Sequence, residues 1–374
     1  MDIRERRCEM KTAGKILLFI VFGCGACVAV EEQQERKVLV YHGASDASAG
    51  VAVGDDMFLM ADDENNILRV YKTDGGPPVY SYDVSEFLQI EQNHPEADIE
   101  GATKIGGRIY WITSHGRNKD GKPRPNRYRF FATDVEVKDG KIAIQPVGKP
   151  CKTLVRTMVA VRALRDLGLH KAAGLGLADL SGKELEKLAP KNEGLNIEGL
   201  CASSDGKTLY IGFRNPRPTN KSTRRACALV VPLNNPAQVI ENGDTPILGE
   251  PMLWDLNGSG IRSMEYSAFH RVYFVVAGSP DESPEFTLYR WSGKSQEQPQ
   301  QVKQLSLSNF SPEALIPFGS SERLLLLSDD GTLPVSVADK SQCAEGELNG
   351  DGTCPNKSLL DPNRKTFRAI WLKP

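Results

Sequence analysis

The chain has 374 residues, of which 40% are hydrophobic and 25% are charged, an ordinary composition for a globular protein. The formal net charge of -2 excludes a chain that is basic as a whole, so we expect no nucleic-acid partner and only local basic sites. The 34 glycines and 23 prolines indicate many turns, and together with frequent Val, Leu and Tyr they favour β structure.

The N-terminal segment has the order of a bacterial signal peptide. Two lysines precede an apolar run from Ile16 to Phe22, small residues follow, and the polar sequence EEQQERK begins at Glu31. The apolar run is too short to cross a bilayer. We therefore expect residues 1–29 to be a signal peptide. Translation starting at Met10 would give a more typical signal peptide than translation starting at Met1, because the preceding MDIRERRCE is a charged prefix. The mature protein is expected to be periplasmic or extracellular. A membrane anchor is the alternative.

Two cysteines in this segment raise a second alternative. Cys24 and Cys27 lie where a lipoprotein signal places its lipidated cysteine, although the bulky Phe22 fits a lipobox poorly. Contact with the membrane is expected only through such a lipid anchor. Further along the chain, Cys343 and Cys354 are expected to form a disulfide, because they close a short loop rich in Gly and Asn and the compartment is oxidising.

Internal repeats determine the predicted fold. Residues 99–112 read IEGATKIGGRIYWI, and residues 197–211 read IEGLCASSDGKTLYI. Residues 261–276 and 312–328 keep the same frame, and residues 48–61 form a weaker copy. Further strand-like runs follow each copy, and groups of four strands repeated every roughly 50 to 65 residues are typical of β-propeller blades.

These repeats predict an all-β protein in which residues 37–374 form a single β-propeller of five or six blades. The closing strand is expected to be FRAIWLKP at residues 367–374, beside KVLVYHG at residues 37–43. Between the second and third copies, residues 154–170 place apolar side chains at helical spacing. We therefore expect a small helical insertion over about 150–195.

The first strand of each blade lines the channel, so the repeat places one residue of each copy near the axis: Ser48, Glu100, Glu198, Arg262 and Glu313. Three carboxylates in a narrow channel repel one another, and their charge must be neutralised. One solution is a hard cation such as calcium, held by Glu100, Glu198 and Glu313. The other is pairing with Arg262 or hydrogen bonding to the backbone, and both solutions remain open.

Two loops that follow second strands are strongly basic, residues 114–129 and residues 213–225. Each contains an Arg-Asn pair close to the preceding strand. Arginine presents fixed donors to a carboxylate or phosphate, and asparagine adds an amide. We therefore expect an anion site on the axial face, or else solvated loops balanced by acidic residues. The six residues expected in the anion site are His115, Arg117, Asn118, Arg214, Asn215 and Arg262.

Several segments resemble a bacterial family catalogued as domain of unknown function 3616. They include DIEGATKIGGRIYWITSHGRNKDGKPRPNR, LNIEGLCASSDGKTLYIGFRNP and FRAIWLKP, and the resemblance runs from about residue 40 to the C-terminus. It implies a β-propeller and no particular activity. More distantly, the IEG repeat is similar to phytase-like and SdiA-regulated propellers and to calcium-dependent propeller apyrases. Those families imply an axial calcium, but Ser48 and Arg262 depart from a fully acidic ring.

Two functions fit these observations. The first is an exported binding scaffold whose axial face holds an anionic small molecule, an acidic glycan or a protein. The second is a calcium-dependent phosphoesterase, phytase-like or apyrase-like, that uses axial calcium and the arginine loops. The sequence contains no P-loop, GxSxG or HExxH motif. Because no catalytic base stands out, we assign no catalytic residue and favour the scaffold.

Overall fold

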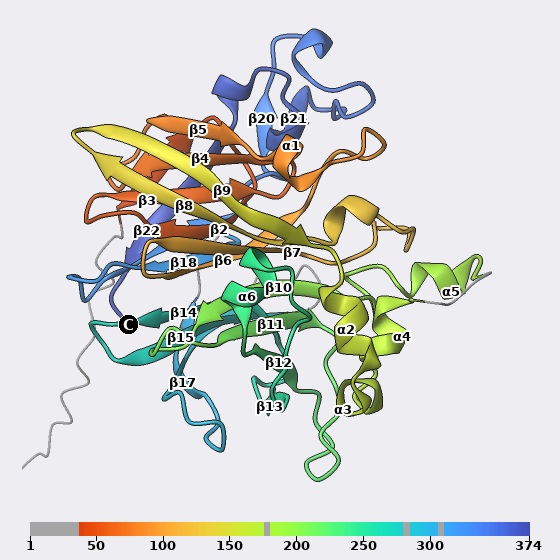
Figure 1. The fold of residues 1–374 in the computed structure, drawn as a ribbon. Helices are drawn as coiled ribbons and strands as arrows, with labels where there is room; N and C mark the ends of the chain where they lie inside the picture. Colours follow the sequence, from red (N-terminus) through yellow and green to blue (C-terminus); the bar gives the residue numbers. More distant parts are fainter. Residues whose placement is uncertain (1–36, 176–179, 280–284, 306–309) are drawn as a thin grey trace, which may run out of the picture. The chain divides into compact units, whose positions relative to one another are not determined.

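Five four-stranded antiparallel sheets surround a common axis in the computed structural model of the chain (Figure 1). The structure describes residues 37–175, 180–279, 285–305 and 310–374. The expected signal peptide at residues 1–29 lies outside these residues. Among the described residues, no helix is both long enough and apolar enough to cross a membrane.

In blades 1 to 4, consecutive strands follow one another outward from the axis. Blade 1 is formed by β2 (Ala47–Ala52), β3 (Met57–Asp62), β4 (Ile67–Lys72) and β5 (Tyr80–Asp83). Blade 2 is formed by β6 (Ile99–Ile105), β7 (Arg108–Thr113), β8 (Phe130–Lys138) and β9 (Lys141–Cys151). Blade 3 is formed by β10 (Asn196–Ala202), β11 (Leu209–Asn215), β12 (Ala228–Leu233) and β13 (Met252–Trp254). Blade 4 is formed by β14 (Gly260–Ser267), β15 (Val272–Gly278), β16 (Phe286–Trp291) and β17 (Gln300–Leu305).

Blade 5 closes the ring with strands from both ends of the described chain. It is formed by β18 (Pro312–Pro317), β19 (Leu324–Ser328), β22 (Thr366–Leu372) and β1 (Val38–His42). The N-terminal strand β1 pairs with β22, so that Val38 lies opposite Ile370. The prediction of a single all-β propeller is therefore confirmed, and the number of blades is five. The FRAIWLKP strand closes the ring beside the N-terminal strand, as expected.

The first strands β2, β6, β10, β14 and β18 contact one another in a ring around the axis. Neighbouring blades cover both faces of these strands, and β10 is buried over its whole length. The glycine of the IEG repeat permits this close approach. A Cβ atom at Gly101 would lie 3.1 Å from Cβ of Leu200 in blade 3, and one at Gly199 would lie 2.9 Å from Cγ2 of Ile261 in blade 4.

A helical insertion lies between blades 2 and 3. Its helices are α2 (Leu154–Ala160), α3 (Arg162–Asp166), α4 (Leu169–Ala173) and α5 (Lys183–Glu186). The expected helical insertion is confirmed. The residues at helical spacing, 154–170, fall into three short helices, because Val161 is extended and Gly168 has a φ of 86°. Leu154, Met158 and Leu164 pack into the core shared by blades 2 and 3, so the insertion braces that side of the ring.

A second insertion, residues 329–365, separates β19 from β22 in blade 5. Its elements are β20 (Pro334–Ser336), η2 (Lys340–Gln342), β21 (Thr353–Pro355), η3 (Asn356–Ser358) and η4 (Pro362–Arg364). A disulfide joins Cys343 to Cys354, and both cysteines pack against Leu359 in a small separate core. We call this segment the disulfide-closed insertion. The remaining short helices are α1 (Ser85–Leu88), η1 (Pro125–Arg127) and α6 (Pro236–Glu241).

Candidate functional site

The first strand of every blade has a β-bulge at the same position. The strand register shifts there, and the residues at the shifts are Ser48, Glu100, Glu198, Arg262 and Glu313. A bulge re-aims the side chain that it carries. The five residues that the repeat aligns are thereby presented at one end of the channel, which we call the axial end.

Two buried arginines neutralise two of the three expected carboxylate ligands. Arg262 places Nη1 3.1 Å from Oε2 of Glu198, and its Nη2 pairs with Glu313. Arg214, near the end of β11, places Nη1 2.9 Å from Oε1 of Glu198. The Nδ2 group of Asn196 donates to the same oxygen at 2.7 Å. Glu198 and Glu313 are therefore paired with arginines of the protein itself. Glu100 differs from them in this respect.

A glycine and an aromatic ring of blade 4 also hold Arg262 in place. A Cβ atom at Gly278 would lie only 3.0 Å from Cγ of Arg262, so this glycine leaves room for the arginine stem. The guanidinium carbon lies 5.9 Å from the centre of the Phe286 ring, a cation–π contact. Arg262 is thus fixed between an aromatic face and its two glutamates.

Glu100 has different neighbours. The carboxylates of Asp63, Asp98 and Glu100 each place an oxygen within 4.8 Å of the others. Asp98 and Glu100 are each only 7% exposed. Within the described part of the chain, Glu100 has no hydrogen-bond or ion-pair partner. We call Asp63, Asp98 and Glu100 the axial carboxylate group.

Burial and mutual repulsion act together on the axial carboxylate group. Burial raises the pKa of Glu100 well above its ordinary value, and the neighbouring carboxylates, Asp98 first, raise it further. Burial also raises the pKa of Asp63 and of Asp98. Asp98 has a partial counter-charge, because Nη1 of Arg127 lies 3.0 Å from its Oδ2. The group must therefore take up protons or bind a cation.

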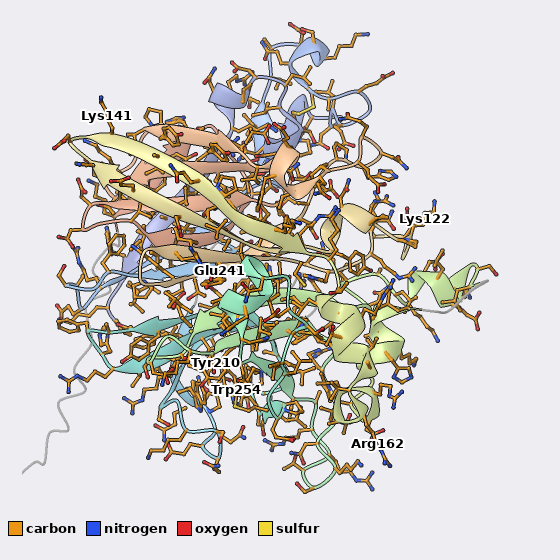
Figure 2. The ribbon with its side chains drawn as sticks, viewed as in Figure 1. Lys122, Lys141, Arg162, Tyr210, Glu241 and Trp254 are labelled. Atoms are coloured by element: carbon orange, nitrogen blue, oxygen red, sulfur yellow. A yellow bond between two sulfur atoms is a disulfide. The ribbon has the colours of Figure 1, made fainter. Side chains whose placement is uncertain are left out.

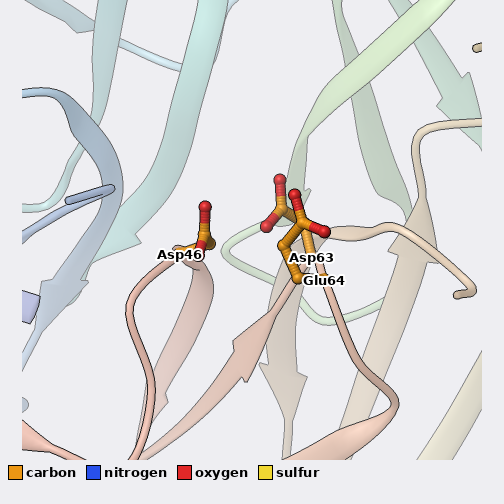
Figure 3. A group of neighbouring side chains, drawn as sticks. All are labelled: Asp46, Asp63 and Glu64. Carbon is orange, nitrogen blue, oxygen red and sulfur yellow. The ribbon is translucent and has the colours of Figure 1, made fainter. Parts of the chain in front are cut away.

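A second group of carboxylates shares Asp63. Asp46 directly precedes β2, Asp63 and Glu64 directly follow β3, and Figure 3 shows these carboxyl groups at one end of blade 1. Each places an oxygen within 4.8 Å of the others. Burial, with the charge of Asp329, raises the pKa of Asp46 to about 9. Nζ of Lys357 lies 2.6 Å from Oε1 of Glu64. We call Asp46, Asp63 and Glu64 the outer carboxylate group.

The Arg-Asn pair of the first basic loop is used within the fold. Arg117 is buried, and it donates to the carbonyls of Gly121 at 3.0 Å and of Gly174 in the helical insertion at 2.8 Å. Oδ1 of Asn118 accepts from two backbone N–H groups of its own loop. Lys122, in the same loop, is exposed and points outward (Figure 2). Arg117 and Asn118 therefore do not join Arg262 at a ligand site.

The other two expected anion-site residues are also engaged locally. Asn215 donates from Nδ2 to the carbonyl of Pro190 at 2.7 Å. Nδ1 of His115 lies 2.8 Å from the carbonyl oxygen of Thr113, and burial lowers the pKa of His115 to about 4. The imidazole is therefore neutral at pH 7. Of the six residues expected to bind an anion, the structure brings Arg214 and Arg262 together, and both are ion-paired.

The acidic sequence ADDENN at residues 61–66, which contains Asp63, indicates a loop that could hold a cation or pair with the basic loops. The sequence analysis did not assign Asp98 as a ligand, although a signal for it exists. Asp98 stands two residues before Glu100, and Asp46 stands two residues before Ser48, so the repeat has a second polar position. Asp63 does not belong to this repeat position, because it lies directly after a second strand. Only the pairing of β2 with β3 brings it to the axial end.

The other end of the channel is lined by turns from all five blades. They surround a cavity of about 560 Å³. Glu265 lines it and accepts hydrogen bonds from Oγ1 of Thr103 at 3.1 Å and from the N–H of Tyr266 at 2.9 Å. Burial raises the pKa of Glu265 to about 8. We call this end the turn end.

The fold and the axial end define a five-bladed β-propeller with a charged axial site. The chain belongs to the family of proteins of unknown function DUF3616, whose model matches residues 46–139 and 179–324. The family resemblance expected from the sequence is therefore confirmed. No finding supports the more distant likeness to phytase-like propellers. A comparison with curated proteins finds none that matches this sequence.

Solved structures are similar to this chain at low identity. The putative oxidoreductase (glucose dehydrogenase) of Thermus thermophilus is 12% identical with a TM-score of 0.41, covering 90% of this chain and 100% of that chain. Glutaminyl cyclase of Myxococcus xanthus is 11% identical with a TM-score of 0.40, covering 78% and 88%. The PQQ-bound aldose sugar dehydrogenase of Streptomyces coelicolor is 8% identical with a TM-score of 0.39, covering 90% and 99%. No activity is carried over from these likenesses.

Proposed function

We propose that the axial end binds a divalent cation such as calcium, and that the protein uses this cation to hold an anionic ligand outside the cytoplasm. The observation that carries the proposal is Glu100. Its buried carboxylate lies with Asp63 and Asp98 within 4.8 Å, and no described residue pairs with it. A divalent ion would satisfy all three groups at once, because hard cations take carboxylate oxygens and water as ligands.

The donor set favours calcium or magnesium over softer metals. The three side chains of the group all offer carboxylate oxygens, and neither histidine nor cysteine belongs to the group. Calcium accepts irregular oxygen geometry more readily than magnesium does. The Arg127 contact leaves Asp98 partly neutralised, so the group suits a site of modest affinity. Such affinity fits the millimolar calcium available to exported proteins.

The anionic ligand belongs to the proposal because of the local charge balance. Arg214 and Arg262 already have carboxylate partners, so a free anion would meet a predominantly acidic surface. A bound divalent cation offsets most of this negative charge and presents open coordination positions beside Glu100. It would then coordinate a phosphate or carboxylate group of a small molecule, an acidic glycan or a protein. A phosphoesterase would use the same cation, so both candidate functions predict the same metal dependence.

Calcium titration of the chelator-treated protein tests the proposal. We expect about one equivalent to bind, and we expect Glu100→Gln to abolish binding. Glu265→Gln is the matched control, because it makes the same change to a buried carboxyl at the turn end, and it should bind as wild type does. Inorganic phosphate and polyphosphate should bind only with calcium present, and turnover of phosphoesters would identify the enzyme. A wild-type protein that takes up no calcium contradicts the proposal.

A further inference from the structure

A lysine from the disulfide-closed insertion lies over the outer carboxylate group. Nζ of Lys357 is 2.6 Å from Oε1 of Glu64, and each of the two side chains is 38% exposed. The two residues are 293 positions apart in the sequence, so the insertion alone brings the ammonium to blade 1. The outer group consequently has a cation of its own, supplied by the protein.

The backbone around Lys357 is held firmly in place. Its N–H donates to the carbonyl of Gly331 at 2.9 Å. The preceding residue, Asn356, is buried and donates from Nδ2 to the carbonyls of Asp330 at 3.1 Å and Thr366 at 2.6 Å. These contacts tie the lysine to the start of the insertion and to the closing strand β22. Its position is therefore a feature of the fold and not a chance surface contact.

The charge of Lys357 reaches beyond Glu64. The nearby charges of Glu64, Asp46 and Asp63 all raise its pKa, so the ammonium stays charged at neutral pH. Asp63 belongs to both carboxylate groups, so this ammonium also stands close to the group proposed to bind the divalent cation. An ammonium paired with Glu64 and a divalent cation bound to the adjacent Asp63 repel each other, so each lowers the affinity of the carboxylates for the other.

We propose that Lys357 is a built-in counter-cation that occupies the outer carboxylate group and confines the divalent cation to Asp63, Asp98 and Glu100. This inference rests on the proposed function and specifies its stoichiometry. The outer group has the same donor type as the axial group, and its carboxylate oxygens likewise lie within 4.8 Å of one another. Without the lysine it would offer a second position for a divalent cation, with Asp63 as the shared ligand.

The test is calcium titration by calorimetry of the full mature chain, with the metal alone as the probe. Lys357→Met should either bind a second equivalent or bind the first roughly tenfold more tightly, because the repulsion is removed. Lys357→Arg should match wild type, because the positive charge is retained. Lys373→Met is the matched control, since Lys373 pairs with Glu322 at 2.9 Å near the β18–β19 turn, away from the axial end.

The outcomes separate the two proposals. If wild type binds one equivalent and Lys357→Met binds one with unchanged affinity, the role of Lys357 is overturned and the cation site stands. Two equivalents in wild type also overturn it. If neither protein binds calcium, the proposed function itself fails, and this inference fails with it. Lys357→Gln serves as a second variant, and melting curves of each variant confirm that it is folded.

Discussion

The two ends of the central channel are formed by the same five first strands, but the buried carboxyl groups at the two ends have different neighbours. At the turn end, Glu265 has Thr103 and Tyr266 as hydrogen-bond donors and no carboxylate close by. At the axial end, Glu100 has Asp98 and Asp63 as neighbours and no donor among the described residues. An isolated buried carboxyl group can be neutralised by one proton, whereas a cluster concentrates charge that one cation can satisfy.

This contrast shows where a ligand is expected. The turn end has a cavity of about 560 Å³, and its buried carboxyl group, Glu265, accepts hydrogen bonds at Oε1 but has no partner at Oε2 among the described residues. Because its pKa is about 8, one proton keeps this carboxyl group neutral at pH 7. The axial end has unsatisfied charge held in place by backbone bulges. Cavity volume and chemistry therefore point to opposite ends of the channel. We place the ligand site at the axial end. Uncompensated buried charge costs free energy in the unliganded protein, and a bound cation recovers that free energy.

The largest expected effect comes from breaking the ion pairs of the axial end. Glu198→Ala would leave Arg214 and Arg262 without a carboxylate that both contact at present. Removal of one partner from a buried ion pair commonly costs about 3–5 kcal/mol. Urea unfolding should show a loss of this size. A loss below about 1 kcal/mol would mean that water reaches these arginines and screens their ion pairs with Glu198.

A smaller effect is expected from the pH dependence of the turn end. The ordinary pKa of Glu265 is 4.5 and burial raises it to about 8, so the folded protein binds a proton that the unfolded chain has released. Stability should therefore fall as the pH rises from about 4.5 to about 8, by about 1.4 kcal/mol per pH unit from this residue. Glu265→Gln should remove that part of the slope. Identical pH profiles for wild type and variant would show that Glu265 ionises normally.

Glu100→Gln should act in the opposite direction to most core substitutions. In the presence of a chelator, the neutral amide removes repulsion within the axial carboxylate group, so stability should rise by about 2 kcal/mol at pH 8. Added calcium should stabilise wild type and leave the variant unchanged. Thermal melts of both proteins, with chelator and with calcium, measure this. A variant that is destabilised with chelator would indicate that Glu100 has an attractive partner.

The smallest effect concerns the disulfide-closed insertion. Replacing Cys343 and Cys354 together by serine should loosen the segment that positions Lys357. The ammonium would then cover the outer carboxylate group less completely, and calcium affinity should rise about two- to threefold, less than for Lys357→Met. Calcium titration of the double variant checks this. An unchanged affinity would show that Asn356 and its contacts hold Lys357 without the disulfide.

The sequence predicted the ring of axial residues well, because the repeat aligns them. Ser48, Glu100, Glu198, Arg262 and Glu313 all occupy the bulge of a first strand. What the repeat does not contain is the pairing among these residues. Whether Arg262 contacts Glu100 or Glu198 depends on side-chain direction and on the room left by distant residues, and a linear pattern of residue types does not encode either.

The basic loops show the same limit more clearly. Arg117 stands in a loop rich in positive charge, which is a reasonable pattern for an anion site. Its guanidinium instead donates to the carbonyl of Gly174, which is 57 residues away in the helical insertion. No local pattern reveals that contact, because the fold of the insertion creates it. The disulfide between Cys343 and Cys354 was easier to anticipate, since the two residues are only 11 positions apart.

The most direct test of the central claim is a crystal structure of the mature protein grown with calcium, with anomalous scattering used to locate the ion. We predict one calcium peak at the axial end, coordinated by Asp63, Asp98 and Glu100, with Lys357 still paired to Glu64. A peak between Glu198 and Glu313, or no peak at saturating calcium, would contradict this account.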